Sequence, residues 1–179
     1  RLLNADKSVG QGIEAELEYA VTPDFIITAA GSYNDTEIKD ADLGVAACGS
    51  GCTVLDPIND NGFALINGNS LPQAPEWIGS FTARYTIPME NGDLYFFTDW
   101  AYKSETNLFL YESTEFTAEA ALEGGLRVGY QTYDGYEVAL WSRNITDVET
   151  VTGAIDFNNF TAIANQPRTF GIELKATFF

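Results

Sequence analysis

The amino-acid sequence predicts an all-β protein, and three observations favour an antiparallel up-and-down transmembrane β-barrel segment over a soluble β-sandwich. Apolar and polar residues alternate with a period of two through about seven segments, as they do in half-buried strands. Short turns at one end and long connections at the other join these segments, which is the asymmetry of outer-membrane barrels. Aromatic residues on the apolar face gather beside the short turns, as in an interfacial girdle.

The alternation is clearest in four of the expected strands. Residues 13–19 alternate apolar side chains with three glutamates, and residues 77–85 set aromatic and small residues against Ile, Ser, Thr and Arg. Residues 94–103 place both of their charges on one face, and residues 170–178 alternate apolar side chains with Gly, Glu, Lys and Thr. Tilted strands of about 12 residues are long enough to cross a hydrocarbon layer of roughly 30 Å.

Turn formers separate the two strands of each expected hairpin. They include Pro23-Asp24, Asn91-Gly92 and Asp134-Gly135, of which Asn-Gly is a strong hairpin signal. The expected strands are residues 8–20, 25–37, 74–87, 93–104, 117–130, 136–146 and 168–179, and the long connections are residues 38–73, 105–116 and 147–167.

The face opposite the apolar one carries the charges of the expected strands. Such charges suit the wet lumen of a barrel, but they suit the solvated face of a soluble sheet equally well. The alternation by itself does not decide between the two. The charged residues on this face are Glu14, Glu16, Glu18, Asp99, Lys103, Arg127, Glu137, Arg143, Glu173 and Lys175.

A set of aromatic residues lies on the apolar face next to the short turns. Aromatic residues favour strands in general, so a sandwich core remains the alternative explanation. In a barrel these side chains would form the membrane girdle on the short-turn side. The predicted girdle comprises Tyr19, Phe25, Tyr85, Phe96, Tyr130, Tyr136 and Phe178.

Composition excludes several classes of function. The 179 residues include 26 Asp and Glu but only 9 Lys and Arg, a formal charge of −17 that argues against binding to nucleic acid. No histidine is present, which excludes a Ser-His-Asp mechanism and His-ligated zinc. No apolar run approaches 18 residues, so no transmembrane helix is expected. We predict no catalytic residue, cofactor or metal, and hence no enzyme.

Two features of the longest connection have both structural and functional readings. Cys48 and Cys52 flank Gly-Ser-Gly, and a structural disulfide is favoured over a redox pair because the spacing is not Cys-x-x-Cys. Residues 56–62 suggest a calcium-binding loop, but they do not fit the EF-hand pattern. With Gly62 at the sixth position of that pattern, the first position falls on Pro57, which cannot supply a ligand side chain. A polar loop rich in turn formers is the preferred interpretation of this stretch.

The order and spacing of several stretches resemble the C-terminal end of a TonB-dependent outer-membrane receptor. Residues 125–130 (Gly-Leu-Arg-Val-Gly-Tyr) and 134–147, which end in Arg-Asn-Ile-Thr-Asp, resemble the penultimate hairpin of that family. Residues 166–174, which begin Gln-Pro-Arg, resemble its final strand. Residues 12–16 and 74–77 resemble further strands of its barrel.

This resemblance implies that residues 1–179 are a single region of a 22-stranded barrel, without the plug domain. The implied function is uptake of a scarce nutrient such as a ferric siderophore, cobalamin, haem or a carbohydrate, energised through TonB. The implied location is the bacterial outer membrane. The implied partners are its lipid bilayer, the rest of the barrel and the plug, TonB, and the outer-membrane assembly machinery. A terminal aromatic would be the assembly signal; Phe178 is in phase with the apolar face, and Phe179 is one residue extra.

The long connections would then be extracellular loops, and the two longest hold the candidate substrate contacts. Two other protein classes remain open. A stand-alone eight-stranded barrel, such as an anchor or adhesin, has about this length, although the predicted strand count is odd and bacterial single-chain barrels are even-numbered. A secreted β-sandwich binding module is the second alternative. The candidate substrate contacts are Asp56, Asn59, Asp60, Asn61, Phe157 and Phe160.

Overall fold

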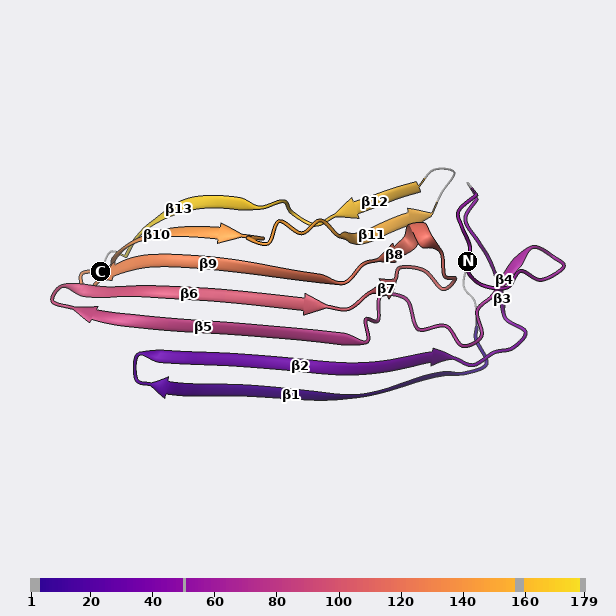
Figure 1. The fold of residues 1–179 in the computed structure, drawn as a ribbon, viewed down its shortest axis with the longest axis horizontal. Helices are drawn as coiled ribbons and strands as arrows, with labels where there is room; N and C mark the ends of the chain where they lie inside the picture. The colour runs from indigo at the N-terminus through magenta and orange to yellow at the C-terminus, as the bar shows by residue number, and fades with distance from the viewer. Residues whose placement is uncertain (1–3, 50, 157–159, 178–179) are drawn as a thin grey trace.

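The computed structural model describes residues 4–49, 51–156 and 160–177, and its main feature is one long antiparallel sheet (Figure 1). The seven strands of this sheet lie in the order β1-β2-β5-β6-β9-β10-β13, which is also their order in the chain. The predicted up-and-down arrangement is therefore confirmed. The strands are β1 (Ser8–Thr22), β2 (Phe25–Ile38), β5 (Trp77–Met89), β6 (Gly92–Lys103), β9 (Ala121–Thr132), β10 (Tyr136–Arg143) and β13 (Thr169–Ala176).

Short turns join β1 to β2, β5 to β6 and β9 to β10 at one end of the sheet, as predicted (Figure 1). Two glycines lie at these turns. A Cβ on Gly92 would lie 2.3 Å from the carbonyl oxygen of Gln131 on the neighbouring strand β9, so only glycine lets the start of β6 lie this close to β9. Gly135 has a φ of 91°, which glycine adopts without strain.

Among the strand limits predicted within the described residues, three differ from the prediction by three or four residues. The third strand of the sheet begins at Trp77 instead of 74, and the fifth begins at Ala121 instead of 117. The sixth ends at Arg143 instead of 146. The fifth starts late because Thr117 and Ala118 pair with another segment, and the sixth stops early because Asn144 adopts a positive φ of 47°.

The long connections carry short hairpins that the sequence did not predict. They contain β3 (Gly44–Ala46) paired with β4 (Phe63–Leu65), β7 (Thr106–Asn107) with β8 (Thr117–Ala118), β11 (Val151–Asp156) with β12 (Phe160–Ala164), and the 3₁₀ turn η1 (Thr114–Phe116).

The largest buried apolar cluster lies among these hairpins and not on the sheet. We call it the loop core; it joins the first two long connections to the end of β2. Its members are Ile38, Val45, Ala64, Ile66, Leu108, Tyr111, Phe116 and Ala118. Among the residues described by the structure, no helix is long and apolar enough to cross a membrane.

Candidate functional site: the two faces of the sheet and the loop end

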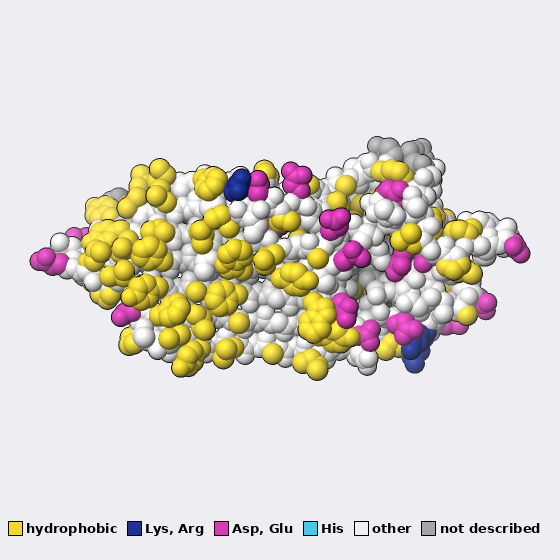
Figure 2. All heavy atoms as spheres, in the orientation of Figure 1, with side chains coloured by type: hydrophobic (Ala, Val, Ile, Leu, Met, Phe, Trp, Pro, Cys, Tyr) yellow, Lys and Arg dark blue, Asp and Glu magenta, His cyan; other side chains and the backbone are white. Residues whose placement is uncertain are grey.

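One face of the sheet presents exposed apolar side chains on six of its seven strands, all except β2. We call it the apolar belt (Figure 2). The exposed fractions are high, with Ile13 73% exposed and Leu174 79%, and contiguous apolar surface of this kind marks a site of protein or membrane contact. The register aligns them in rows, and one such row runs from Leu17 through Phe81 to Trp100. Figure 2 shows acidic side chains gathered instead toward the loop end and the turn tips.

The predicted girdle residues that the structure describes lie on this face near the short turns. Tyr85 is directly opposite both Phe25 and Phe96 in the register. The rings of Phe25 and Tyr85 meet edge to face with centroids 6.0 Å apart. Tyr19, Tyr130 and Tyr136 lie on the same face of β1, β9 and β10, and Phe178 lies outside the described residues, as does Phe179.

A second aromatic row marks the other border of the apolar belt. Tyr33 and Trp77 are opposite one another, with ring centroids 4.7 Å apart. On β5, Phe81 lies midway between Trp77, which belongs to one aromatic row, and Tyr85, which belongs to the other. The belt is therefore an uncharged band between two aromatic borders, which is the pattern of a membrane-facing barrel wall.

The opposite face carries a polar network with one residue from each of five consecutive strands. Arg127 on β9 is its centre, because its Nη2 is 2.8 Å from Glu137 Oε1 on β10 and 2.8 Å from Glu173 Oε1 on β13. Its Nε donates to the Tyr95 hydroxyl on β6 at 2.7 Å, and that hydroxyl also donates to Glu137. Arg84 on β5 lies over the Tyr95 ring, 4.3 Å from its centroid.

This network depends on a glycine that the sequence analysis did not single out. A Cβ on Gly129 would lie 2.5 Å from the Tyr95 ring, so glycine lets the ring lie flat on the neighbouring strand. Tyr95 and Arg84 were also not among the predicted site residues. Their position on the charged face was visible in the alternation, but their contact with Arg127 depends on register.

The charged face divides into a paired half and an unpaired half. Arg143 on β10 forms an ion pair with Asp99 on β6, with a distance of 2.8 Å between Nη1 and Oδ2. By contrast, Glu14, Glu16 and Glu18 on β1 form no ion pair within the described part of the chain. The basic residues of this face lie on the strands from β5 to β13, and β1 and β2 contribute none.

The structure gives the predicted substrate contacts different surroundings. Asp56 is buried, and its carboxylate accepts hydrogen bonds from Asn69 Nδ2 at 3.0 Å and from the Glu112 backbone N–H at 2.7 Å. Asn59 Oδ1 accepts from two backbone N–H groups within its own loop.

The remaining predicted contacts are exposed or undescribed. Asp60 and Asn61 are exposed, and the Phe160 ring packs edge to face on Phe116 with centroids 5.6 Å apart. Phe157 lies outside the described residues. The structure thus gives Asp56 and Phe160 contacts to the same connection, 104–120.

Cys48 and Cys52 are joined in a disulfide whose Cα atoms are 6.0 Å apart, and both pack on the loop core. Polar contacts hold the same region together. Burial and the hydrogen bond to Asp156 raise the pKa of Tyr111, and that bond is 2.8 Å long. The Thr53 backbone N–H donates to Glu115 at 2.9 Å and lowers the pKa of that exposed carboxyl.

The two stretches that carried the family resemblance meet at the base of the third connection. Asn144 Nδ2 donates to the carbonyl oxygens of Val148 and Gln166, at 2.9 and 3.0 Å. Arg168 Nη2 is 2.9 Å from Asp147 Oδ2. These contacts therefore hold the start of the connection that contains β11 and β12 against its end. No group of acidic or sulfur side chains within the described ranges is arranged to hold a metal ion.

No protein-family model matches the sequence, and no curated protein matches it. Solved structures do match its fold. The ferric yersiniabactin uptake receptor FyuA from Yersinia pestis aligns with a TM-score of 0.76 and 18% identity, over 98% of this chain and 24% of the receptor. The siderophore receptor PiuA from Acinetobacter baumannii aligns with a TM-score of 0.70 and 15% identity, over 94% of this chain and 22% of the receptor. The ferric citrate transporter FecA aligns with a TM-score of 0.68 and 21% identity, over 96% of this chain and 24% of the transporter.

The chain spans about a quarter of the length of these receptors and transporters. At such identities the likeness is one of fold. The chain is thus an all-β segment with the fold of part of a receptor barrel, and the resemblance seen in the sequence is confirmed at that level.

Proposed function

We propose that this chain forms part of the barrel wall and three extracellular loops of an outer-membrane receptor for a scarce nutrient. The nutrient is of the class of ferric siderophores, cobalamin, haem or carbohydrates, and TonB supplies the energy through a plug domain. The observation that carries the proposal is the apolar belt, because an exposed uncharged band between two aromatic rows is stable only against lipid.

The edges of the sheet support a larger barrel as partner. Within the described residues β1 and β13 are the two outer strands, and each has a neighbour on one side only. An open edge of this length exposes unpaired backbone groups, which are not tolerated in a membrane. Further strands on both sides fit these edges better than closure into a stand-alone eight-stranded barrel. A β-sandwich is disfavoured because the other described sheets have only two strands each.

The direction of the strands supports an orientation in the membrane. The connections between hairpins are long at one end of the sheet and short at the other (Figure 1). Long loops of outer-membrane barrels are extracellular and short turns periplasmic. The loop core would then face the medium, and β13 would run toward the periplasm, where assembly machinery could read a terminal aromatic.

Cell fractionation of the full-length protein tests this proposal. We expect it in the outer-membrane fraction, with the faster gel mobility of an unheated barrel, and we expect nutrient uptake to stop when tonB is deleted. A full-length protein found in the soluble fraction would contradict the proposal. Uptake that continues without TonB would contradict the energised mechanism alone.

Deletion of the exposed loop tip, residues 59–62, tests the predicted substrate contacts separately. We expect weaker binding of the transported nutrient, while the buried Asp56 keeps its hydrogen bonds to Asn69 and Glu112. Unchanged affinity would remove this tip from the list of substrate contacts.

A further inference from the structure

Three Asn-Gly pairs occur in the chain, and the structure gives each of them a different setting. Asparagine is a chemically labile residue, and a glycine after it has no side chain to hinder its own amide nitrogen from reaching the asparagine side chain. Each pair is therefore a candidate for spontaneous deamidation. All three asparagines are exposed, so exposure does not rank them, and the contacts around each pair must do so. The pairs are Asn61-Gly62, Asn67-Gly68 and Asn91-Gly92.

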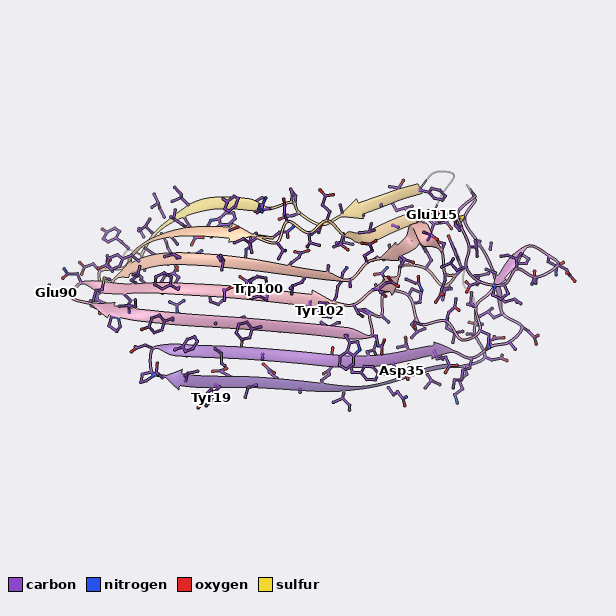
Figure 3. All side chains as sticks on the ribbon, viewed as in Figure 1. Tyr19, Asp35, Glu90, Trp100, Tyr102 and Glu115 are labelled. Atoms are coloured by element: carbon purple, nitrogen blue, oxygen red, sulfur yellow. A yellow bond between two sulfur atoms is a disulfide. The ribbon has the colours of Figure 1, made fainter. Side chains whose placement is uncertain are left out.

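Asn91-Gly92 is held at the end of the main sheet. Gly92 is buried, and in the register it lies opposite Met89 on β5 and Thr132 on β9. Figure 3 places Glu90, the residue before Asn91, at the short-turn end of the sheet. The Gly92 nitrogen can therefore reach the Asn91 side chain only if this end of the sheet opens.

Asn67-Gly68 is tied to a distant segment through both of its residues. Asn67 Oδ1 accepts a hydrogen bond from the Asp40 backbone N–H at 2.9 Å, which fixes the side chain that would react. The Gly68 N–H donates to the carbonyl oxygen of Ile38 at 2.8 Å, and Ile38 is a buried member of the loop core. Reaction at this pair requires that both hydrogen bonds break.

Asn61-Gly62 lies in an exposed turn directly before β4, and the hydrogen bonds of the pair stay within that turn. The Asn61 N–H donates to Asn59 Oδ1 at 3.0 Å, and the Gly62 N–H donates to the Asn59 carbonyl oxygen at 2.9 Å. Within the described part of the chain, the Asn61 side chain makes no hydrogen bond, and a Cβ on Gly62 would have no atom within 4 Å apart from its chain neighbours. This pair can therefore rearrange without disturbing the sheet or the loop core.

We infer that Asn61 is a site of covalent modification by deamidation, and that in the folded protein it reacts ahead of Asn67 and Asn91. The Gly62 nitrogen forms a bond to Asn61 Cγ and loses its proton. The bond from Cγ to the side-chain nitrogen breaks, and ammonia leaves with that proton. Water then opens the resulting cyclic imide at either of its carbonyl carbons. One product has aspartate at position 61, and the other has isoaspartate, in which the backbone runs through the side chain.

Both products change the loop tip. Each adds a negative charge next to Asp60, and isoaspartate also lengthens the backbone by one carbon. The turn is continuous with the β3–β4 hairpin, because Asn59 Oδ1 also accepts from the Phe63 N–H at 3.0 Å and Phe63 pairs with Ala46. The inference concerns the chemistry of this tip, and it does not depend on the proposed function.

Incubation of the full-length protein in detergent at mildly alkaline pH tests this inference. Peptide mass spectrometry follows the conversion of amide to acid at the three Asn-Gly pairs, in the folded protein and after unfolding in guanidinium. In the folded protein we expect Asn61 to react about fivefold faster than Asn67 or Asn91, the factor that one net hydrogen bond to a distant segment supplies. In the unfolded protein the three rates should be similar, because only the local sequence then acts.

Asn61→Gln is the matched control, because its longer side chain closes the cyclic imide less readily. In this variant the tip peptide should keep its mass, while the slow reaction at Asn67 and Asn91 continues. Three outcomes would overturn the inference: Asn61 that stays intact in the folded protein, Asn67 or Asn91 reacting as fast as Asn61, and a tip peptide that still gains acid in Asn61→Gln, which would assign the reaction to Asn59. The comparison of the three pairs needs no variant, so a folding defect cannot obscure it.

Discussion

Replacing Phe81 by arginine should show directly that the apolar belt faces lipid. Phe81 is 40% exposed on the belt, four residues from Trp77 and four from Tyr85. At about 3.3 Å per residue, each aromatic border is roughly 13 Å away along the strand. With a strand tilt of about 40°, this is ~10 Å along the membrane normal. In a barrel wall that spans the membrane, residue 81 would therefore lie near the bilayer midplane.

An arginine at that depth costs about 2–4 kcal/mol on the lipid face of a barrel. We therefore expect Phe81→Arg to be less stable than Phe81→Ala by this amount, since the alanine variant already accounts for the lost ring. Ser80 is the matched position, because it is the neighbouring residue on the charged face. Ser80→Arg should differ from Ser80→Ala by less than about 1 kcal/mol, because arginine stays in water in the lumen.

Guanidinium unfolding of the full-length protein in lipid vesicles measures these differences. Tryptophan fluorescence reports the transition, and linear extrapolation gives the free energy of unfolding for each variant. If Phe81→Arg and Ser80→Arg cost the same relative to their alanine variants, the belt does not face lipid and the assignment of the two faces is wrong.

Three further predictions concern the polar network and the loops. Arg127→Met should lower the free energy of unfolding by about 2–3 kcal/mol. This is less than the cost of breaking a fully buried ion pair, because the network is partly exposed. Adding Glu137→Gln to Arg127→Met should restore part of the lost stability, because it removes the unpaired carboxylate. Cys48→Ser should lower the local stability of the loop core by about 2 kcal/mol, measured as faster amide hydrogen exchange with unchanged exchange in the sheet. The folded-state pKa of Glu115 lies below 4.5, so its contribution is present above that pH and is lost as the pH falls through the lowered value. The protection factor of the Thr53 amide, which corrects for the slower intrinsic exchange at low pH, should fall in that acidic window, and Glu115→Gln should abolish this pH dependence.

Each of these predictions has a distinct contradicting result. Arg127→Met with an unchanged transition would mean that the network adds nothing to stability. Equal exchange in the loop core with and without the disulfide would make the bridge dispensable. An acid-induced loss of protection at Thr53 that persists in Glu115→Gln would assign the effect to another carboxyl.

The alternation predicted the sheet well because strand faces have a strict period of two. Every strand of the sheet was expected within a few residues, and its order followed from the short turns. The errors fall at strand ends, where neighbours decide. Thr117 continues the apolar–polar pattern of the fifth strand, yet it belongs to β8 because it pairs with Asn107.

The loops were predicted poorly because their structure depends on contacts between distant segments. The sequence predicts Asp56 as a substrate contact in a polar loop. It is buried because Asn69 and Glu112, 13 and 56 residues away, both donate to it. Phe160 is likewise a predicted substrate contact, and its packing on Phe116 could not be predicted from the sequence. No local pattern encodes these partners.

The sequence alone determined the strand count, the turn ends and the separation of apolar from charged side chains, since these follow from neighbouring residues. It did not determine which charged residues pair. Register decided that Tyr95, Arg127 and Glu137 would meet across three strands, because a strand that shifts by one residue sends its side chains to the other face. Packing likewise decided that the long connections share one core. These features arise only when segments far apart in the chain are brought together.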